Sequence, residues 1–299
     1  YIVQRIKSNA QSNTLAFMKI VIQHLTGISD ATAHALLDSF PGAAERLNER
    51  AWVVRHTLFT AAQKRELIEH AHAQQIDVAC LERDITWADF KVLAMDMDST
   101  LINIECIDEI ADLAGKKAEV AAITEASMRG EIADFNESLR RRMAFFAGTP
   151  ARLLDDVLRD RLRTNPGVHE LIQAAHAHGV QTVLVSGGFT YFAEQVQTQL
   201  GLNHIHANTL EIKDGLLTGE VLGEIVNGEV KARLVREHCE RLNAPCDQAI
   251  AMGDGANDLP MMSISGLSVA YRAKPKVQEQ AMMTLNFVGL DGLAVVLNA

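Results

Sequence analysis

The sequence predicts an α/β protein with a Rossmann-like parallel sheet, a helical block inserted into that sheet, and a small α/β module before it. Short apolar runs alternate with helix-like segments from about residue 91 onward, and polar residues directly follow several of these runs. Between 104 and 162 the pattern changes to one rich in Glu, Ala, Arg and Leu. The length of 299 residues suggests about two domains.

The first part of the chain divides into a polar stretch and a small module. The stretch 1–17 has no periodicity, so we expect it to be disordered or foreign to the domain and leave it out of the fold. Residues 18–88 indicate an accessory α/β domain, with Asp30 and Thr60 expected to cap its helices. Three β-rich runs are expected as its strands: Lys19–Ile22, Trp52–Phe59 and Ile76–Leu81.

Residues 89–299 indicate the main domain. The apolar run 91–95 ends at Asp96 and is typical of a buried parallel strand. A helical insertion follows at about 104–164, above the carboxyl ends of the strands, where open α/β sheets bind ligands. Later strands are expected at 180–185, 248–252, 267–270 and 285–288.

Composition indicates which binding partners and which cellular compartment to expect. The net charge of -10 argues against a nucleic acid or an anionic membrane as the main partner. No apolar run reaches the length of a membrane span. The four cysteines form no C-x-x-C pair, as expected for reduced thiols in a cytoplasmic protein. The sequence leaves open whether the chain forms a homodimer.

The string Asp96-Met97-Asp98-Ser99-Thr100 stands directly after the first expected core strand. Two carboxylates two residues apart can converge at a strand end. An aspartate can attack phosphorus, and a second carboxylate can protonate the leaving alkoxide and then deprotonate water. The alternative is a solvated or capping pair.

Two further signals suit a phosphate group. Ser186-Gly187-Gly188 follows an expected strand, and its small residues let backbone N–H groups approach phosphate oxygens. Lys231 stands near the start of an expected helix at about 230–242, where its ammonium could neutralise phosphate charge. Taken singly, a glycine turn and a surface lysine would explain them.

The fourth signal is the stretch from Gly253 to Asp258, after the expected strand at 248–252. Asp254, Asn257 and Asp258 offer oxygen atoms that suit a hard cation such as Mg²⁺. Carboxylates this dense repel one another unless a cation is present. The four signals together indicate a magnesium-dependent site for phosphoryl transfer.

From about residue 91 to 299 the chain resembles the haloacid dehalogenase (HAD) superfamily. MDMDST, VSGGF, the lysine and GDGANDLPM match that superfamily's motifs in order. The stretches Glu105–Ile110, Ser138–Arg142 and Ala273–Lys276 are closer to the branch that acts on phosphoserine. The resemblance implies a HAD core with a helical cap, and the N-terminal module resembles the extra, sometimes ACT-like, domain of longer members.

The resemblance also implies roles at the phosphate end of the site. Asp96 would be the nucleophile and Asp98 the general acid and base. Mg²⁺ would be held by the Asp96 carboxylate, the Asp98 main-chain carbonyl and Asp254, with Asp258 steadying the metal's water shell. The groups implied around the phosphoryl oxygens are Ser186, Gly187, Lys231 and Asn257.

The helical insertion is implied to read the rest of the substrate. Glu105 would pair with an ammonium group, and Arg142, with Arg141 as the near alternative, would grip a carboxylate. Met128 and Phe135 would form an apolar wall. The implied enzyme is a phosphoric monoester hydrolase that converts O-phospho-L-serine to L-serine and phosphate through an aspartyl phosphate, the last step of serine biosynthesis.

Three other functional hypotheses stay open. The chain could hydrolyse another small phosphometabolite, because only Glu105 and the arginines distinguish substrates. It could also be a non-enzymatic switch that is phosphorylated on aspartate, although Asp98 is placed to shorten the life of such a group. The N-terminal module could in addition bind an amino acid as a regulator.

Overall fold

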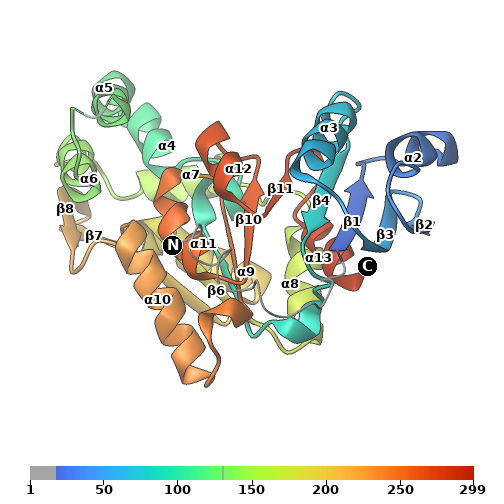
Figure 1. Ribbon diagram of the computed structural model, residues 1–299. Helices are drawn as coiled ribbons and strands as arrows, with labels where there is room; N and C mark the ends of the chain where they lie inside the picture. Colours follow the sequence, from blue (N-terminus) through green and yellow to red (C-terminus); the bar gives the residue numbers. More distant parts are fainter. Residues whose placement is uncertain (1–17, 130) are drawn as a thin grey trace. The chain divides into compact units, whose positions relative to one another are not determined.

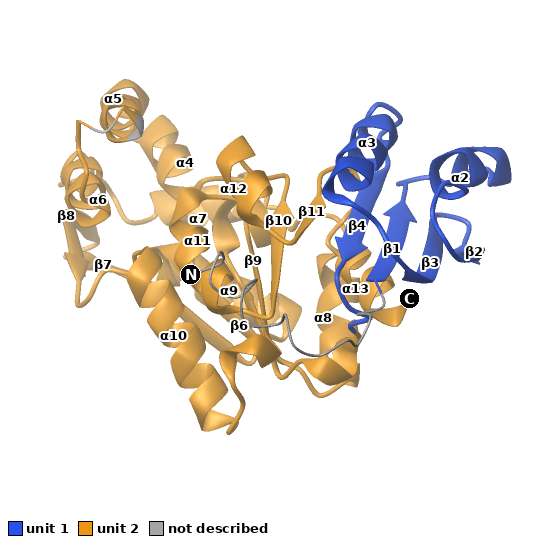
Figure 2. Cartoon of the chain, viewed as in Figure 1, with its two compact units in different colours: residues 1–85 blue, residues 86–299 orange. Residues whose placement is uncertain are grey.

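The computed structural model describes residues 18–129 and 131–299, without the side chain of Met128. The predicted disordered segment 1–17 lies outside the described residues. The chain divides into two compact units, and the boundary between them in the sequence falls between Ile85 and Thr86 (Figure 2). None of the described helices combines the length and apolarity needed to cross a membrane.

The N-terminal unit is an antiparallel sheet in the order β2-β3-β1-β4, with helices α2 and α3 packed over an apolar cluster. Its elements are β1 (Met18–Gln23), α2 (Asp30–Leu37), β2 (Ala44–Asn48), β3 (Ala51–Thr57), α3 (Ala61–His72) and β4 (Asp77–Leu81). The three expected strands are present, but β2 was missed. It is an edge strand of mostly exposed polar residues, so it lacks the apolar alternation that marks a strand.

Local capping starts both helices of this unit. The prediction for α2 was wrong by one residue, because Ser29 is the N-cap and its hydroxyl accepts a hydrogen bond from the Thr32 N–H at 3.1 Å. Asp30 lies in the first turn, where a negative charge also favours the helix dipole. Thr60 caps α3 as predicted, and Gln63 completes a capping box.

The second unit is built on a seven-stranded sheet in the order β11-β10-β9-β5-β6-β7-β8. Figure 1 shows β7 and β8 on one side of this unit and β10 and β11 on the other. Its pairs are parallel except β7 with β8. The strands are β5 (Val92–Met95), β6 (Gln181–Phe189), β7 (His204–Lys213), β8 (Leu216–Leu222), β9 (Ala249–Gly253), β10 (Leu267–Tyr271) and β11 (Met283–Leu285). The helices are α4 (Cys106–Leu113), α5 (Lys117–Met128), α6 (Phe135–Ala144), α7 (Leu153–Asp160), α8 (Val168–Ala177), α9 (Thr190–Leu200), α10 (Gly228–Arg241), α11 (Leu259–Ile264), α12 (Pro275–Gln280) and α13 (Asp291–Asn298).

The predicted fold class is confirmed, with α4 to α7 inserted between β5 and β6. Sequence reasoning missed β7 and β8, and it placed β11 at 285–288 instead of Met283–Leu285. The β7–β8 hairpin is half-exposed, so its pattern is weak. Asp214 and Gly215, both with positive φ, form the turn between its strands, and such a dipeptide is a hairpin signal that was available in the sequence.

The strand order places the polar signals together. β5 is fully buried and lies between β9 and β6, with Met95 in register with both Met252 and Leu184. Asp96 therefore follows β5 at the carboxyl end of the parallel strands, which is also the edge of the sheet where β9 ends at Gly253. The parallel arrangement brings motifs that are some 150 residues apart in sequence to one edge.

A histidine cluster lies between β7 and α10, outside that edge. His204 and His206 are two residues apart on β7 and so share one face of the strand. The Nε2 atoms of His206 and His238 are 2.9 Å apart, and the His204 ring lies 4.7 Å from the His238 ring. Burial lowers the pKa of His238 to about 4, and His204, His206 and Arg241 add to the shift.

This cluster makes stability depend on pH. Below its ordinary pKa of about 6.5, His238 takes up a proton in the unfolded chain but not in the fold, so stability falls from pH 6.5 toward about 4. His238→Gln has no titrating ring at this position. We therefore expect its free energy of unfolding to fall less steeply over this range than that of the native protein, with a difference of up to about 1.4 kcal/mol per pH unit. Urea unfolding at pH 7, 6 and 5 measures the free energy of unfolding of both proteins. The same dependence of this free energy on pH in the two proteins would contradict the prediction.

Candidate active site

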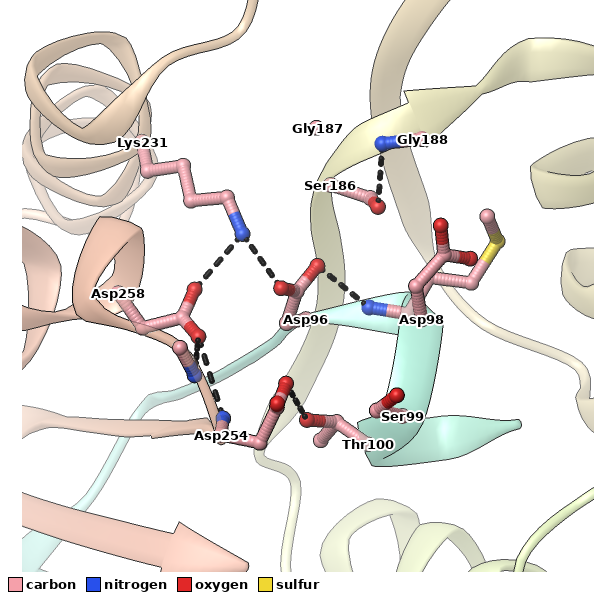
Figure 3. Close-up of polar contacts among 12 residues, drawn as sticks. Asp96, Asp98, Ser99, Thr100, Ser186, Gly187, Gly188, Lys231, Asp254 and Asp258 are labelled. Carbon is pink, nitrogen blue, oxygen red and sulfur yellow. Dashed lines mark hydrogen bonds and ion pairs between the residues drawn. The ribbon is translucent and has the colours of Figure 1, made fainter. Parts of the chain in front are cut away.

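A buried charge network forms the floor of the site (Figure 3). Asp96 accepts a hydrogen bond from the Met97 N–H at 2.7 Å through Oδ1, and its Oδ2 lies 2.8 Å from Lys231 Nζ. Lys231 reaches this point from the first turn of α10, and its Nζ is also 2.7 Å from Asp258 Oδ1. Burial disfavours the ammonium, but the two carboxylates outweigh it and raise the pKa of Lys231.

Asp96, Asp254 and Asp258 each place a carboxylate oxygen within 4.8 Å of the other two. Burial, followed by mutual repulsion, raises the pKa of Asp254 to about 7. The pKa of Asp258 is likewise raised to about 7, by burial first and by Asp96 next. Such a cluster is relieved by a cation, and an all-oxygen donor set suits Mg²⁺.

The three carboxylates are not equivalent. Asp258 Oδ2 accepts hydrogen bonds from the Asp254 and Gly255 N–H groups, at 3.2 and 3.0 Å, while its Oδ1 binds Lys231. Asp258 therefore braces the loop, and Asp96 and Asp254 are left to face a cation. The Thr100 hydroxyl lies 3.4 Å from Asp254 Oδ1 and orients that carboxylate.

Asp98 has one carboxylate oxygen free for chemistry. Its Oδ2 accepts a hydrogen bond from the Cys106 N–H at 3.3 Å, whereas Oδ1 is buried and has no partner among the described residues. Burial, with Glu105 and Asp96 nearby, raises the pKa of Asp98 well above its ordinary value. A carboxyl group in this state can carry a proton to a leaving group.

The end of β6 forms a tight loop beside Asp98. Ser186 is fully buried, and its hydroxyl accepts a hydrogen bond from the Gly188 N–H at 2.9 Å. A Cβ on Gly188 would lie 3.0 Å from Asp98 Oδ2 and 3.2 Å from Ser186 Oγ. The missing side chain at this position therefore lets the loop and Asp98 approach one another.

A cavity of about 350 Å³ joins these groups. Nine of the predicted site residues line it: Asp96, Asp98, Glu105, Phe135, Arg142, Ser186, Gly187, Asp254 and Asn257. Lys231 and Asp258 lie next to this lining, in the ion pairs described above. The side chain of Met128, predicted as part of the wall, lies outside the described part of the chain.

Glu105 faces the cavity from the start of α4. It occupies the N-cap position, but its side chain makes no capping bond. Instead its Oε1 accepts a hydrogen bond from the Ser99 hydroxyl at 2.7 Å. Burial raises the pKa of Glu105, and this hydrogen bond opposes the shift. Ser99 has φ of 56°, in the left-handed region, which is a strained conformation for a residue other than glycine.

The two arginines considered for the carboxylate differ in surroundings. Arg141 is exposed and forms an ion pair with Glu137 one turn away. Arg142 lines the cavity and has no carboxylate within ion-pair distance among the described residues. Its Nε donates only a long hydrogen bond of 3.4 Å to the Ser138 carbonyl. Burial lowers the pKa of Arg142, while Asp108 and Glu105 oppose the shift. Arg142 is thus the arginine that is free to bind an anion in the cavity.

Several site residues were given no role from sequence. Ser99 and Thr100 lie inside the aspartate string, so position alone could have suggested them. Lys274 lines the cavity, and it belongs to the stretch Ala273–Lys276 already noted for its resemblance. Asn208, whose amide donates to the Gly187 carbonyl at 2.8 Å, lies on the missed strand β7 and carries no sequence signal.

Comparison with known proteins identifies the family of the chain. Residues 93–263 match the model of the haloacid dehalogenase-like hydrolases. A phosphoserine phosphatase of Polaromonas sp. strain JS666 is 56% identical over 214 residues, which cover 70% of this chain and 91% of that protein. The chain therefore belongs to the haloacid dehalogenase-like hydrolase family.

Two solved structures resemble the chain over nearly its whole length. A HAD family hydrolase from Salmonella enterica serovar Typhi has a TM-score of 0.82 at 30% identity and covers 93% of this chain and 98% of its own. A probable phosphoserine phosphatase from Vibrio cholerae, in unliganded form, has a TM-score of 0.79 at 36% identity and covers 94% of this chain and 86% of its own.

The buried network predicts a large effect of Lys231. Lys231→Met leaves Asp96 and Asp258 without their cation, and we expect a loss of about 3–5 kcal/mol in the free energy of unfolding. Adding Asp258→Asn should recover part of that loss. Arg233→Met on the same helix breaks only exposed pairs and should cost under about 1 kcal/mol. Urea unfolding with chelator present measures the free energy of unfolding of the two single variants and the double variant. Equal losses of stability in Lys231→Met and Arg233→Met would contradict a stabilising role of the buried network.

Proposed function

We propose that the protein is a magnesium-dependent phosphatase that hydrolyses O-phospho-L-serine to L-serine and phosphate. The observation that carries this proposal is the make-up of the cavity: it joins the aspartate pair to the Glu105 carboxylate, with Asp108 beside it in the lining, and to the Arg142 guanidinium. Phosphoserine has an ammonium and a carboxylate, which meet the opposite charges of Glu105 and Arg142, while its phosphate meets Lys231 and the Mg²⁺ that the aspartates would hold. Relatives named phosphoserine phosphatase support the same substrate.

The reaction divides between the two aspartates. The Asp96 carboxylate attacks phosphorus, the bond from phosphorus to the serine oxygen breaks, and Asp98 gives its proton to that oxygen. This leaves an aspartyl phosphate on Asp96. Asp98, now ionised, takes a proton from a water molecule that attacks phosphorus, which releases phosphate and restores Asp96. Lys231, held against Asp96, stabilises the charge that develops on the phosphoryl oxygens.

The donor set fits Mg²⁺, which Asp96, Asp254 and the Asp98 main-chain carbonyl would hold. When bound, Mg²⁺ neutralises negative charge on the phosphoryl group. Asp258 keeps the Asp254 loop in place through its two backbone hydrogen bonds. Ser186, Gly187 and Asn257 lie on the cavity wall beside these carboxylates, where they can hold the phosphoryl oxygens.

The proposal is tested by a phosphate-release screen. Phosphoserine, phosphothreonine, phosphoglycolate and a sugar phosphate are compared, each with Mg²⁺ and with chelator. We expect phosphoserine to give the highest kcat/KM and activity to need Mg²⁺. Asp96→Asn should abolish turnover while the circular dichroism spectrum stays native. A preference for another phosphate would reject the substrate, and full activity of the variant would reject the nucleophile.

The arginine assignment gives a separate prediction. Arg142→Lys keeps the charge but loses the two-pronged grip on a carboxylate, so KM for phosphoserine should rise about 10- to 100-fold. Arg141→Lys is the matched control on the neighbouring position. Because Arg141 is exposed and paired with Glu137, its KM should stay within about twofold of native. Steady-state kinetics of both variants decides, and a larger effect at Arg141 would reverse the assignment.

A further inference from the structure

Asn227 uses both ends of its side-chain amide. Its Oδ1 accepts a hydrogen bond from the Val230 N–H at 3.1 Å and so caps α10. Its Nδ2 donates a hydrogen bond to Asn136 Oδ1 at 3.1 Å. Asn136 belongs to α6, one of the inserted helices, whereas α10 covers the core sheet. One amide therefore bridges the insertion and the core.

Both of these helices carry parts of the proposed site. Lys231 lies in the first turn of α10, and its backbone N–H donates to the Asn227 carbonyl at 2.8 Å. Phe135 and Arg142, which line the cavity, lie on α6. The Phe135 Cζ atom is 3.2 Å from where a Cβ on Gly187 would lie, so the ring of this first residue of α6 packs against the phosphate loop.

Asn208 extends the bridge to that loop. It is 1% exposed, its Nδ2 donates to the Gly187 carbonyl at 2.8 Å, and its Oδ1 accepts from the Val226 N–H at 2.9 Å. The backbone beside Asn227 is thus fixed to the loop that carries Ser186 and Gly187. The Asn208 amide thus joins Gly187 to Val226, the backbone leads from Val226 to Asn227, and the Asn227 amide reaches Asn136.

We propose that Asn227 is a positioning residue that couples the seating of α6 to the phosphate site. This inference rests on the proposed function and adds a residue to it. While the Asn227–Asn136 bond is formed, α6 holds Arg142 and Phe135 over the cavity. Without it, α6 is less firmly seated, so phosphoserine loses contact with Arg142 while the phosphate contacts of the core remain.

The test separates the two ends of the amide. Asn227→Ser and Asn227→Asp both keep an oxygen that caps α10. The serine hydroxyl stands one atom short of the amide that reaches Asn136, and an ionised aspartate has no hydrogen to donate. Asn136→Ala removes the same bond from the other side. We measure kcat/KM for phosphoserine and for p-nitrophenyl phosphate, which has no carboxylate for Arg142 to bind. The ratio of the two values should fall about two- to tenfold in each variant, the effect of one neutral hydrogen bond. Asn227→Ser combined with Asn136→Ala should fall no further.

Hydrogen exchange provides a readout that needs no activity. In the ligand-free protein, backbone amides of α6 should exchange about two- to tenfold faster in each variant, and those of α10 should not. The coupling would be overturned if the ratio of the two kcat/KM values stayed unchanged, as it would after a proportional loss on both substrates. Additive effects in the double variant would overturn it as well. If the native protein fails to hydrolyse phosphoserine, the proposed function is wrong, and exchange at α6 alone then decides whether the bridge exists.

Discussion

The buried repulsion among Asp96, Asp254 and Asp258 is the constraint on which the active site depends. Three carboxylates within 4.8 Å, mostly removed from water, would be costly without positive charge. Lys231 supplies one such charge from inside the protein, and backbone N–H groups satisfy the second oxygen of Asp258. One ammonium shared by Asp96 and Asp258 leaves an excess of negative charge, which Asp96 and Asp254 present at the cavity surface. The acidic chain can therefore accept a phosphate only through a local positive site.

The same constraint explains why glycines occur where they do. Asp258 folds back so closely that a Cβ on Gly253 would lie 2.3 Å from its Oδ2. At the start of α10, a Cβ on Gly228 would lie 2.9 Å from the Asn257 carbonyl oxygen and 3.0 Å from Pro260 Cγ. Only this close approach of α10 lets the Lys231 ammonium sit between Asp96 and Asp258. The glycines are thus required by the charge network.

The sequence predicted what depends on strong local signals. β5 and β9 are continuous apolar runs followed at once by aspartates, so their parallel pairing and the convergence of Asp96 with Asp254 could be inferred. β2 and the β7–β8 hairpin are edge elements with partly exposed polar residues, and their existence depends on tertiary pairing. The choice between Arg141 and Arg142 could not be made from sequence, because it depends on which side of α6 faces the cavity.

The division of the site between core and insertion determines how selectivity can arise. Core strands contribute the carboxylates and the serine loop, which recognise only a phosphate. Glu105 and Arg142, which we propose recognise the rest of the substrate, come from the inserted segment. Selection for phosphoserine then requires the two parts to be held in fixed register, since a guanidinium that is displaced by about 1 Å loses its directional bonds. The Asn227 amide joins the core to α6 of the insertion, and the Asn208 amide fixes the backbone beside it to the Gly187 loop of the core. Substrate choice in this architecture therefore depends on core residues that need not touch the amino-acid end of the substrate.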